Sequence, residues 1–218
     1  MPVIINSPHS GSRLPPGFLA QSQLSTAQLR SSEDSHVDEL FMGCLDGGIP
    51  LLRALVSRSF LDLNREAYEF DPRMFKTELP AHMNTTSPRV ACGLGTIPKT
   101  VGDGLNIYAG TIDLHEALQR IEDIHRPYHR TLAALIEEAH KVMGSVLLVD
   151  CHSMPSSAIG KGQAASRHVD IVLGDRFGRA CDPGVLAEVS QLLQDAGLTV
   201  VHNKPYAGGF ITDRKSVV

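Results

Sequence analysis

Two short apolar runs that each end abruptly at polar residues constrain the fold of this chain more than any other feature. Residues 3–5 (VII) run into a polar segment that contains His9, and residues 146–149 (VLLV) run into one that contains His152. A short apolar run closed by polar, Gly or Pro residues is typical of a buried strand that ends at a turn. Ligands of open α/β sheets bind beyond the carboxyl ends of the strands. We therefore expect both histidines at one edge of a sheet, where two imidazoles could hold a metal ion.

Strands alternate with helices along the rest of the chain. Further strands are predicted over residues 50–56, 59–63, 169–173 and 198–201, and helices over residues 33–45, 112–139 and 183–195. Pro127 predicts a kink or break in the long helix. Residues 66–108 hold many Pro and Gly residues with little periodicity, which favours an irregular excursion. The alternation predicts a single three-layer α/β domain over residues 1–218, with a mainly parallel or mixed sheet.

Composition and charge argue against several classes of function. The chain has 218 residues, of which 42% are hydrophobic, and its net charge of -4 disfavours a nucleic-acid partner. No apolar run approaches the ~20 residues that cross a bilayer, and the N-terminus shows no signal-peptide pattern. The four cysteines include no C-x-x-C pair, which excludes a zinc ribbon. We expect a cytoplasmic protein with reduced thiols and no membrane partner, and its oligomeric state stays open.

An acidic cluster lies downstream of the first predicted strand and could complete a metal site. Zinc hydrolases commonly use three protein ligands from His and carboxylates and leave one position open for water. Residues 32–39 (SEDSHVDE) offer several carboxylates, of which Asp34 would begin a helix and suit the helix dipole. A single histidine at a strand end is more often a partly exposed loop residue. The matching contexts of His9 and His152 favour a site, although composition alone leaves both interpretations open.

Residues that follow two other predicted strands could contact a ligand. Arg65 comes directly after residues 59–63, so its guanidinium could hold an acidic substrate or form a surface ion pair. Gly208 and Gly209 follow the last predicted strand, and paired glycines let backbone approach a ligand. A plain turn explains the two glycines equally well. No G-x-S-x-G elbow occurs in the chain, so a serine hydrolase of that type is unsupported.

Two further histidines and one cysteine favour structural roles. His125 and His129 are spaced i and i+4 like a helical metal pair, but Pro127 between them weakens that geometry. We expect the pair to lie on a helix surface or a cleft wall. Cys151 is adjacent to His152, and because successive strand side chains point to opposite faces the two should diverge. Cys151 is therefore predicted to be a buried small hydrophobe.

Taken together, these segments resemble the N-formylglutamate amidohydrolase (N-formylglutamate deformylase) family. The matching segments are residues 7–11 (SPHSG), 33–34 (ED), 37–40 (VDEL), 62–65 (DLNR), 93–98 (GLGTIP), 127–129 (PYH), 150–155 (DCHSMP), 173–176 (LGDR) and 203–209 (NKPYAGG). The resemblance spans residues 3–212 in order, and the combination is specific although each piece alone would be weak. That family is similar to zinc-dependent exopeptidases of the carboxypeptidase and aspartoacylase kind, which implies a zinc-exopeptidase-like (phosphorylase/hydrolase-like) fold.

The resemblance implies both a metal site and a reaction. It implies that His9, Asp34 and His152 bind Zn²⁺, with Glu33 as the alternative third ligand, although such ligands also suit other divalent metals. The implied reaction is hydrolysis of the formyl amide of N-formyl-L-glutamate, a small acidic substrate, to formate and L-glutamate in histidine degradation. The residues that the resemblance implies for substrate binding are Asn64, Arg65, Arg176, Asn203, Gly208 and Gly209.

The chain departs from the family pattern after Thr212. The family continues with a further strand and helix that carry a Gln-x-Glu-x-x-Arg-like segment, whose Glu is the general base by analogy with the exopeptidases. This chain instead ends with residues 213–218 (DRKSVV), so we expect a fragment or a frameshifted end with the base beyond Val218. Two alternatives follow: a non-catalytic family member that binds a metal and an acidic ligand, and a hydrolase of another N-acyl amino acid.

Overall fold

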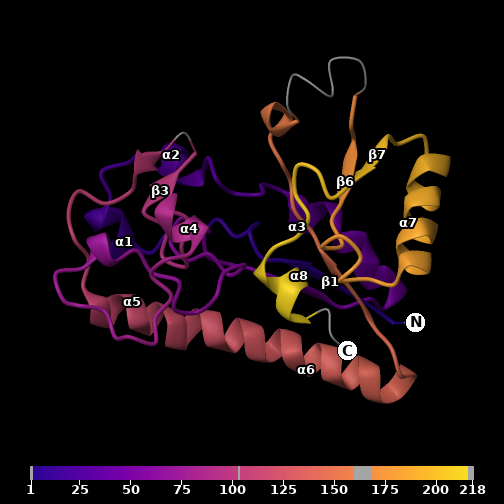
Figure 1. Ribbon diagram of the computed structural model, residues 1–218, viewed down its shortest axis with the longest axis horizontal. Coiled ribbons are helices and arrows are strands. Elements are labelled where there is room, and N and C mark those ends of the chain that lie inside the picture. Colours follow the sequence, from indigo (N-terminus) through magenta and orange to yellow (C-terminus); the bar gives the residue numbers. More distant parts are fainter. Residues whose placement is uncertain (1, 103, 160–167, 216–218) are drawn as a thin grey trace. The chain divides into compact units, whose positions relative to one another are not determined.

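The computed structural model describes residues 2–102, 104–159 and 168–215 (Figure 1). The chain divides into two compact units, Met1–His152 and Ser153–Val218, which we call the first unit and the second unit and describe separately. The expectation of one domain over residues 1–218 stays a prediction.

The first unit is built on a three-stranded parallel sheet. Its central strand β1 (Val3–Ser7) lies between β2 (Leu51–Arg53) and β5 (Leu147–Asp150), and Ile5 pairs with both neighbours. Pairing continues past the end of β5, because the Cys151 amide donates to the carbonyl of Asn6. The carboxyl ends of β1 and β5 are therefore adjacent, as the two apolar runs predict.

One small apolar cluster of the first unit contains Cys151. Its buried members are Ile5, Val37 and Cys151, from β1, from a short helix and from the end of β5. Burial and then the charge of Asp150 raise the pKa of the Cys151 thiol to about 12. The thiol is thus a neutral, buried group, which confirms the prediction of a small hydrophobe.

Residues 59–63 form a turn, so the prediction of a strand there is wrong. The amides of Phe60 and Leu61 both donate to the carbonyl of Ser57 instead of to a neighbouring strand. Phe60, Leu61 and Leu63 are nevertheless buried. A short apolar run indicates burial, but it does not by itself distinguish a strand from a buried turn. Arg65 therefore follows a loop.

The helix predicted over residues 33–45 is broken into two pieces. The pieces are the α-helix α3 (Val37–Leu40) and the 3₁₀-helix η1 (Met42–Gly47). The residue before α3, His36, is left-handed with a φ of 64°, a conformation that cannot continue a right-handed helix. Asp34 accordingly lies in the loop before α3 and not in its first turn.

The long helical pattern after residue 112 is interrupted as Pro127 predicts. Helix α5 (Leu114–Arg120) runs through a π-helical turn, η3 (Ile121–His125), into α6 (Arg126–Met143). The amide of Arg126 donates to the carbonyl of Ile121, five residues earlier. Figure 1 shows α5 and α6 following one another along the edge of the first unit.

Residues 66–108 form an irregular excursion with short elements only, as predicted. The elements are the 3₁₀-helix η2 (Pro72–Met74), α4 (Pro88–Ala91) and the antiparallel pair β3 (Thr100–Val101) and β4 (Leu105–Asn106). Two short helices, α1 (Pro16–Gln21) and α2 (Thr26–Arg30), precede α3 in the chain.

The second unit contains a strand–helix–strand crossover. Strands β6 (Ile171–Leu173) and β7 (Val200–His202) pair in parallel and are connected by α7 (Pro183–Asp195). The predicted elements over residues 169–173, 183–195 and 198–201 are therefore confirmed. The unit also holds the 3₁₀-helix η4 (Ser156–Ala158) and the C-terminal helix α8 (Phe210–Lys215).

Helices combine with parallel strand pairing in both units, which makes the chain a mixed α/β protein. The three-layer arrangement stays a prediction. Within the described ranges, none of the helices is both long and apolar enough to cross a membrane.

Candidate metal centre

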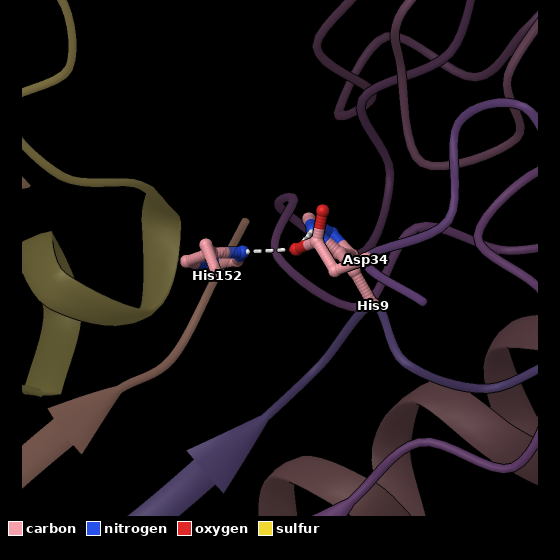
Figure 2. Close-up of side chains that lie close together, drawn as sticks. All are labelled: His9, Asp34 and His152. Atoms are coloured by element: carbon pink, nitrogen blue, oxygen red, sulfur yellow. Dashed lines mark hydrogen bonds and ion pairs between the residues drawn. The ribbon is translucent and has the colours of Figure 1, made fainter. Parts of the chain in front are cut away.

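Three side chains with metal-binding atoms meet beyond the carboxyl ends of β1 and β5. His9 follows β1, His152 follows β5, and Asp34 joins them from the loop before α3. The amide of Asp34 donates to the carbonyl of His9 over 3.0 Å, which anchors that loop beside the first histidine. Figure 2 shows the Asp34 carboxylate pointing toward His152, with His9 close to Asp34. The three residues predicted as metal ligands are therefore neighbours.

The carboxylate lies between the Nδ1 atoms of the two rings. Oδ2 of Asp34 is 2.8 Å from Nδ1 of His152 and 3.5 Å from Nδ1 of His9. One potential ligand atom from each residue lies within 4.8 Å of the others. The side chain of His9 is 3% exposed, whereas that of His152 is 32% exposed. The group is thus mostly buried and reaches solvent at His152.

Each imidazole has a second carboxylate at its outer nitrogen. Nε2 of His9 is 2.6 Å from Oδ1 of Asp62, and Nε2 of His152 is 3.1 Å from Oδ2 of Asp150. A carboxylate at Nε2 favours a proton there, so Nδ1, the atom that faces Asp34, is the one that could bind a metal ion after losing any proton of its own. Metal-binding histidines are commonly oriented by such carboxylate partners. Neither aspartate was assigned a role from the sequence.

The electrostatics of the group favour positive charge. Burial raises the pKa of Asp34, but the hydrogen bond from His152 and the positive charges of His9 and His152 outweigh that effect and hold the pKa well below its usual range. Burial likewise raises the pKa of Asp62, and the charges of Arg65, His9 and Arg58 hold it well below its usual range.

The partly exposed imidazole responds to the same carboxylates. Burial lowers the pKa of His152, yet the carboxylates of Asp150 and Asp34 outweigh it and raise the pKa to about 10. Negative charge at both ring nitrogens therefore stabilises a cation at this position.

A bound divalent cation fits the residues that surround the group. Nδ1 of His9 is buried and has no hydrogen-bond partner, and an unsatisfied buried nitrogen calls for an explanation. Two imidazole nitrogens and one carboxylate oxygen form a donor set that zinc hydrolases use. Such an ion would satisfy the orphaned nitrogen of His9 and compensate the surrounding negative charge.

The structure separates the two candidates for the third ligand. Within the ranges that the structure describes, the group of potential metal ligands is His9, Asp34 and His152. The carboxylate of Glu33 instead accepts a hydrogen bond from Nε of Arg30 over 2.9 Å. Asp34 therefore has the better position.

The resemblance places Asn64 and Arg65 at the substrate carboxylate. Of the two, Asn64 contacts the candidate metal centre. Its Nδ2 is 3.2 Å from Oδ2 of Asp150 and 3.0 Å from Nε2 of His152. The guanidinium of Arg65 donates to the carbonyls of Leu94 and Asn64. Substrate binding by Asn64 and Arg65 stays a prediction.

Two of the other predicted substrate residues lie together in the second unit. Oδ1 of Asn203 accepts from the amides of Asp175 and Phe177, and this holds a loop in which Arg176 and Phe177 are left-handed. The Arg176 guanidinium pairs with Asp213, with Nη2 and Oδ1 3.0 Å apart. These contacts hold the conformation of the loop, and the substrate role stays a prediction.

The two glycines that follow β7 are also in the second unit. Gly208 has a φ of 129°, and a Cβ there would lie 2.9 Å from Thr212 and 3.1 Å from the Arg176 side chain. The position therefore requires glycine. The carbonyl of Gly209 accepts from the amide of Asp213 at the start of α8. Ligand binding by the two glycines stays a prediction.

Comparisons with known proteins point to one family. A family model described as N-formylglutamate amidohydrolase matches residues 1–216 of the chain. The N-formylglutamate deformylase of Pseudomonas aeruginosa is 28% identical over 215 residues, covering 97% of this chain and 74% of that protein. The N-formylglutamate deformylase of Pseudomonas putida is 29% identical over 218 residues, covering 97% of this chain and 73% of that protein.

Two solved structures are similar to the chain. The crystal structure of N-formylglutamate amidohydrolase from Ralstonia eutropha JMP134 has a TM-score of 0.90 and 33% identity, covering 98% of this chain and 76% of that one. A gene product from Agrobacterium tumefaciens has a TM-score of 0.59 and 22% identity, covering 94% of this chain and 69% of that one. The second likeness concerns the fold alone.

Proposed function

This chain belongs to the N-formylglutamate amidohydrolase family, and from that premise we propose that it hydrolyses the formyl amide of N-formyl-L-glutamate to formate and L-glutamate. We propose a zinc ion as the cofactor, held by His9, Asp34 and His152. The observation that carries the proposal is the buried, unpartnered Nδ1 of His9, which faces the carboxylate that also contacts His152. The zinc-exopeptidase-like fold is part of the same proposal.

The chemistry of the proposed site divides between the metal and the chain. A zinc ion with an open position polarises a substrate carbonyl and lowers the pKa of its bound water to ~7. Asp62 and Asp150 hold the imidazoles of His9 and His152 so that each Nδ1 faces the site. Asp34 stays ionised, because the hydrogen bond from His152 and the charges of both histidines lower its pKa.

The acidic end of the substrate has a proposed anchor in the first unit. A guanidinium forms a planar, paired hydrogen-bonding fork with a carboxylate, so we propose Arg65 as the anchor in the first unit, with Asn64 beside it. The Arg65 side chain is 12% exposed and its Nη2 lies 3.5 Å from Oδ2 of Asp62. For the second unit we propose the residues that the family resemblance implies, Arg176, Asn203, Gly208 and Gly209.

Formate release tests the proposal directly. Purified protein loaded with one equivalent of zinc is incubated with N-formyl-L-glutamate, and formate is measured with a formate dehydrogenase assay. We expect the rate of formate release from this substrate to exceed the rate from N-formyl-L-leucine, which has no side-chain carboxylate. No formate from protein that holds stoichiometric zinc would contradict the proposal, and binding of the substrate without turnover would favour a non-catalytic family member. Turnover of N-acetyl-L-glutamate alone would favour a different N-acyl substrate.

The metal ligands are tested by matched histidine variants. We expect His9→Ala and His152→Ala to lose bound zinc and formate release while they stay folded by circular dichroism. His140→Ala changes a histidine in the last turn of α6 and is the matched control. Stoichiometric zinc in both ligand variants would contradict the assignment.

A further inference from the structure

The loop that carries Asn64 is not part of a sheet, yet it lies in the interior. Leu63 and Asn64 are 1% and 3% exposed, and residues 57–66 form turns and irregular structure. Buried backbone carbonyls need hydrogen-bond partners, and a loop has no neighbouring strand to supply them. The carbonyls on either side of Asn64 must therefore be satisfied in another way.

Two imidazoles supply those partners. Nε2 of His125 lies 2.9 Å from the carbonyl oxygen of Arg65, and Nε2 of His129 lies 2.9 Å from the carbonyl oxygen of Leu63. A backbone carbonyl only accepts, so both rings donate through Nε2. Asn64 is thus held by hydrogen bonds to the residues before and after it.

The local helix geometry presents both histidines to the loop. His125 ends the π-helical turn η3, and His129 lies in the first turns of α6. Positions i and i+4 share one helix face, and the two ring centroids are 4.3 Å apart. Pro127 between them has no amide hydrogen to donate. Single π-helical turns inside α-helices occur frequently at functional sites.

Asn64 in turn contacts the aspartates that orient both candidate metal ligands. The backbone N–H of Asn64 donates to Oδ1 of Asp62 over 2.9 Å, and the same oxygen contacts Nε2 of His9. Its Nδ2 donates to Oδ2 of Asp150, the oxygen that contacts Nε2 of His152. One residue therefore links the outer partners of the two imidazoles.

We propose that His125 and His129 are positioning residues that fix Asn64 through the carbonyls of Arg65 and Leu63. Asn64 then keeps Asp62 and Asp150 aligned with the two metal-binding histidines. Any effect of the pair on formate release rests on the proposed function, but its effect on Asn64 does not. Tyr128, between the two histidines, supports the same centre, because its hydroxyl donates to Asn6 over 2.6 Å and Asn6 donates to Oδ1 of Asp150 over 2.7 Å.

Two substitutions of His129 distinguish the effect of its hydrogen bond to the Leu63 carbonyl from the effect of its packing. His129→Leu removes the donor, whereas His129→Gln keeps an amide N–H that can reach a carbonyl. In metal-free protein, we expect the side-chain amide resonances of Asn64 in ¹⁵N–¹H spectra to shift in His129→Leu and to return toward their original positions in His129→Gln. His140→Leu, on the same helix, should leave them unchanged. Unchanged Asn64 resonances in a folded His129→Leu protein would overturn the proposal.

A double-variant cycle tests whether the histidine acts through Asn64. Changing residues that orient metal ligands typically weakens metal binding ~10–100-fold, so we expect at least ~10-fold weaker zinc binding in His129→Leu and in Asn64→Ala, measured by competition with a chelator. The double variant should be no weaker than Asn64→Ala alone. Independent, additive losses would contradict the proposal.

The outcomes also separate this proposal from the proposed function. If the unaltered protein releases no formate, the proposed function fails, while the Asn64 resonances still decide the positioning role. If the unaltered protein releases formate and the variants behave independently, the positioning role fails and the function stands. His125→Leu and His125→Gln repeat the comparison at the carbonyl of Arg65.

Discussion

Nε2 of His9 lies 2.6 Å from Oδ1 of Asp62, and both side chains are 3% exposed. Arg58 donates to the other carboxylate oxygen over 2.8 Å, so the aspartate is held from two sides. This buried pair fixes the ring of His9 before any metal arrives. An aspartate at the outer nitrogen of a metal-binding histidine contributes by fixing the orientation of the ring in this way.

Replacement of this aspartate should therefore weaken metal binding. We expect Asp62→Asn to bind zinc ~10–100-fold more weakly, because a neutral amide no longer favours the His9 tautomer with the proton on Nε2. The measurement is competition for zinc with a chelator. Asp71→Asn is a matched control, because Asp71 is a buried aspartate that pairs with Arg73 and Lys99. Equal zinc affinity in Asp62→Asn and the unaltered protein would contradict the prediction.

Metal binding should release a proton from His152. The pKa of His152 is raised to about 10 by Asp150 and Asp34 against the effect of burial, so the ring is protonated at pH 7.5 in metal-free protein. A metal ion must displace that proton, and zinc affinity should fall as the pH is lowered below 10. Calorimetry in two buffers with different ionisation enthalpies measures the release. The heat of zinc binding should depend on the buffer, and a heat that does not would contradict the prediction.

His125 should make the protein less stable in acid. Burial lowers its pKa below the ordinary value of 6.5 and outweighs the hydrogen bond to the Arg65 carbonyl and the charge of Asp62, while Arg126 lowers it further. The His125 side chain therefore takes up a proton at a higher pH in the unfolded chain than in the folded chain. The contribution of neutral, buried His125 to the free energy of unfolding is complete well above pH 6.5, and it shrinks as the pH falls through 6.5.

Urea unfolding at several pH values checks the contribution of His125. The difference in unfolding free energy between the unaltered protein and His125→Gln should be larger at pH 8 than at pH 5.5. The His140→Gln protein should follow the pH dependence of the unaltered protein, since His140 lies in the last turn of α6. A constant difference across this pH range would contradict the assignment.

Gly11 should not tolerate a side chain. A Cβ at Gly11 would lie 2.3 Å from the carbonyl oxygen of Val56, and backbone cannot move aside as a flexible side chain can. We expect Gly11→Ala to lower the unfolding free energy by ~1–3 kcal/mol, the usual cost of overpacking. At Gly17 a Cβ would meet nothing within 4 Å, so Gly17→Ala should be close to neutral. Equal stability of the two variants would contradict the prediction.

Local signals in the sequence predicted the two strand ends that carry His9 and His152. The apolar runs before His9 and His152 are closed by polar residues within a few positions, so the strand ends could be located without knowing their partners. Residues 59–63 show the limit of such signals, because an apolar run is equally compatible with a buried turn. Only the backbone hydrogen bonds to Ser57 distinguish the two.

The residues that orient the centre depend on contacts between distant parts of the chain. His125 meets the carbonyl of a residue 60 positions earlier, and His129 one 66 positions earlier. Nothing in the spacing of two helical histidines indicates which backbone lies opposite. His125 is 4% exposed, so the expectation that it lies on a helix surface or a cleft wall is wrong, and its role required the tertiary structure.

The central place of β1 has a consequence for how the protein acquires its site. The pairing that brings Asn6 to Asp150 joins residues 144 positions apart. Non-local pairings of this kind form slowly, because chain entropy must be lost before the contacts can compensate for it. His9 and His152 become neighbours only when β5 docks on β1. The candidate metal centre thus exists only in chains whose central sheet has closed, and an ion that binds there would stabilise that closed sheet.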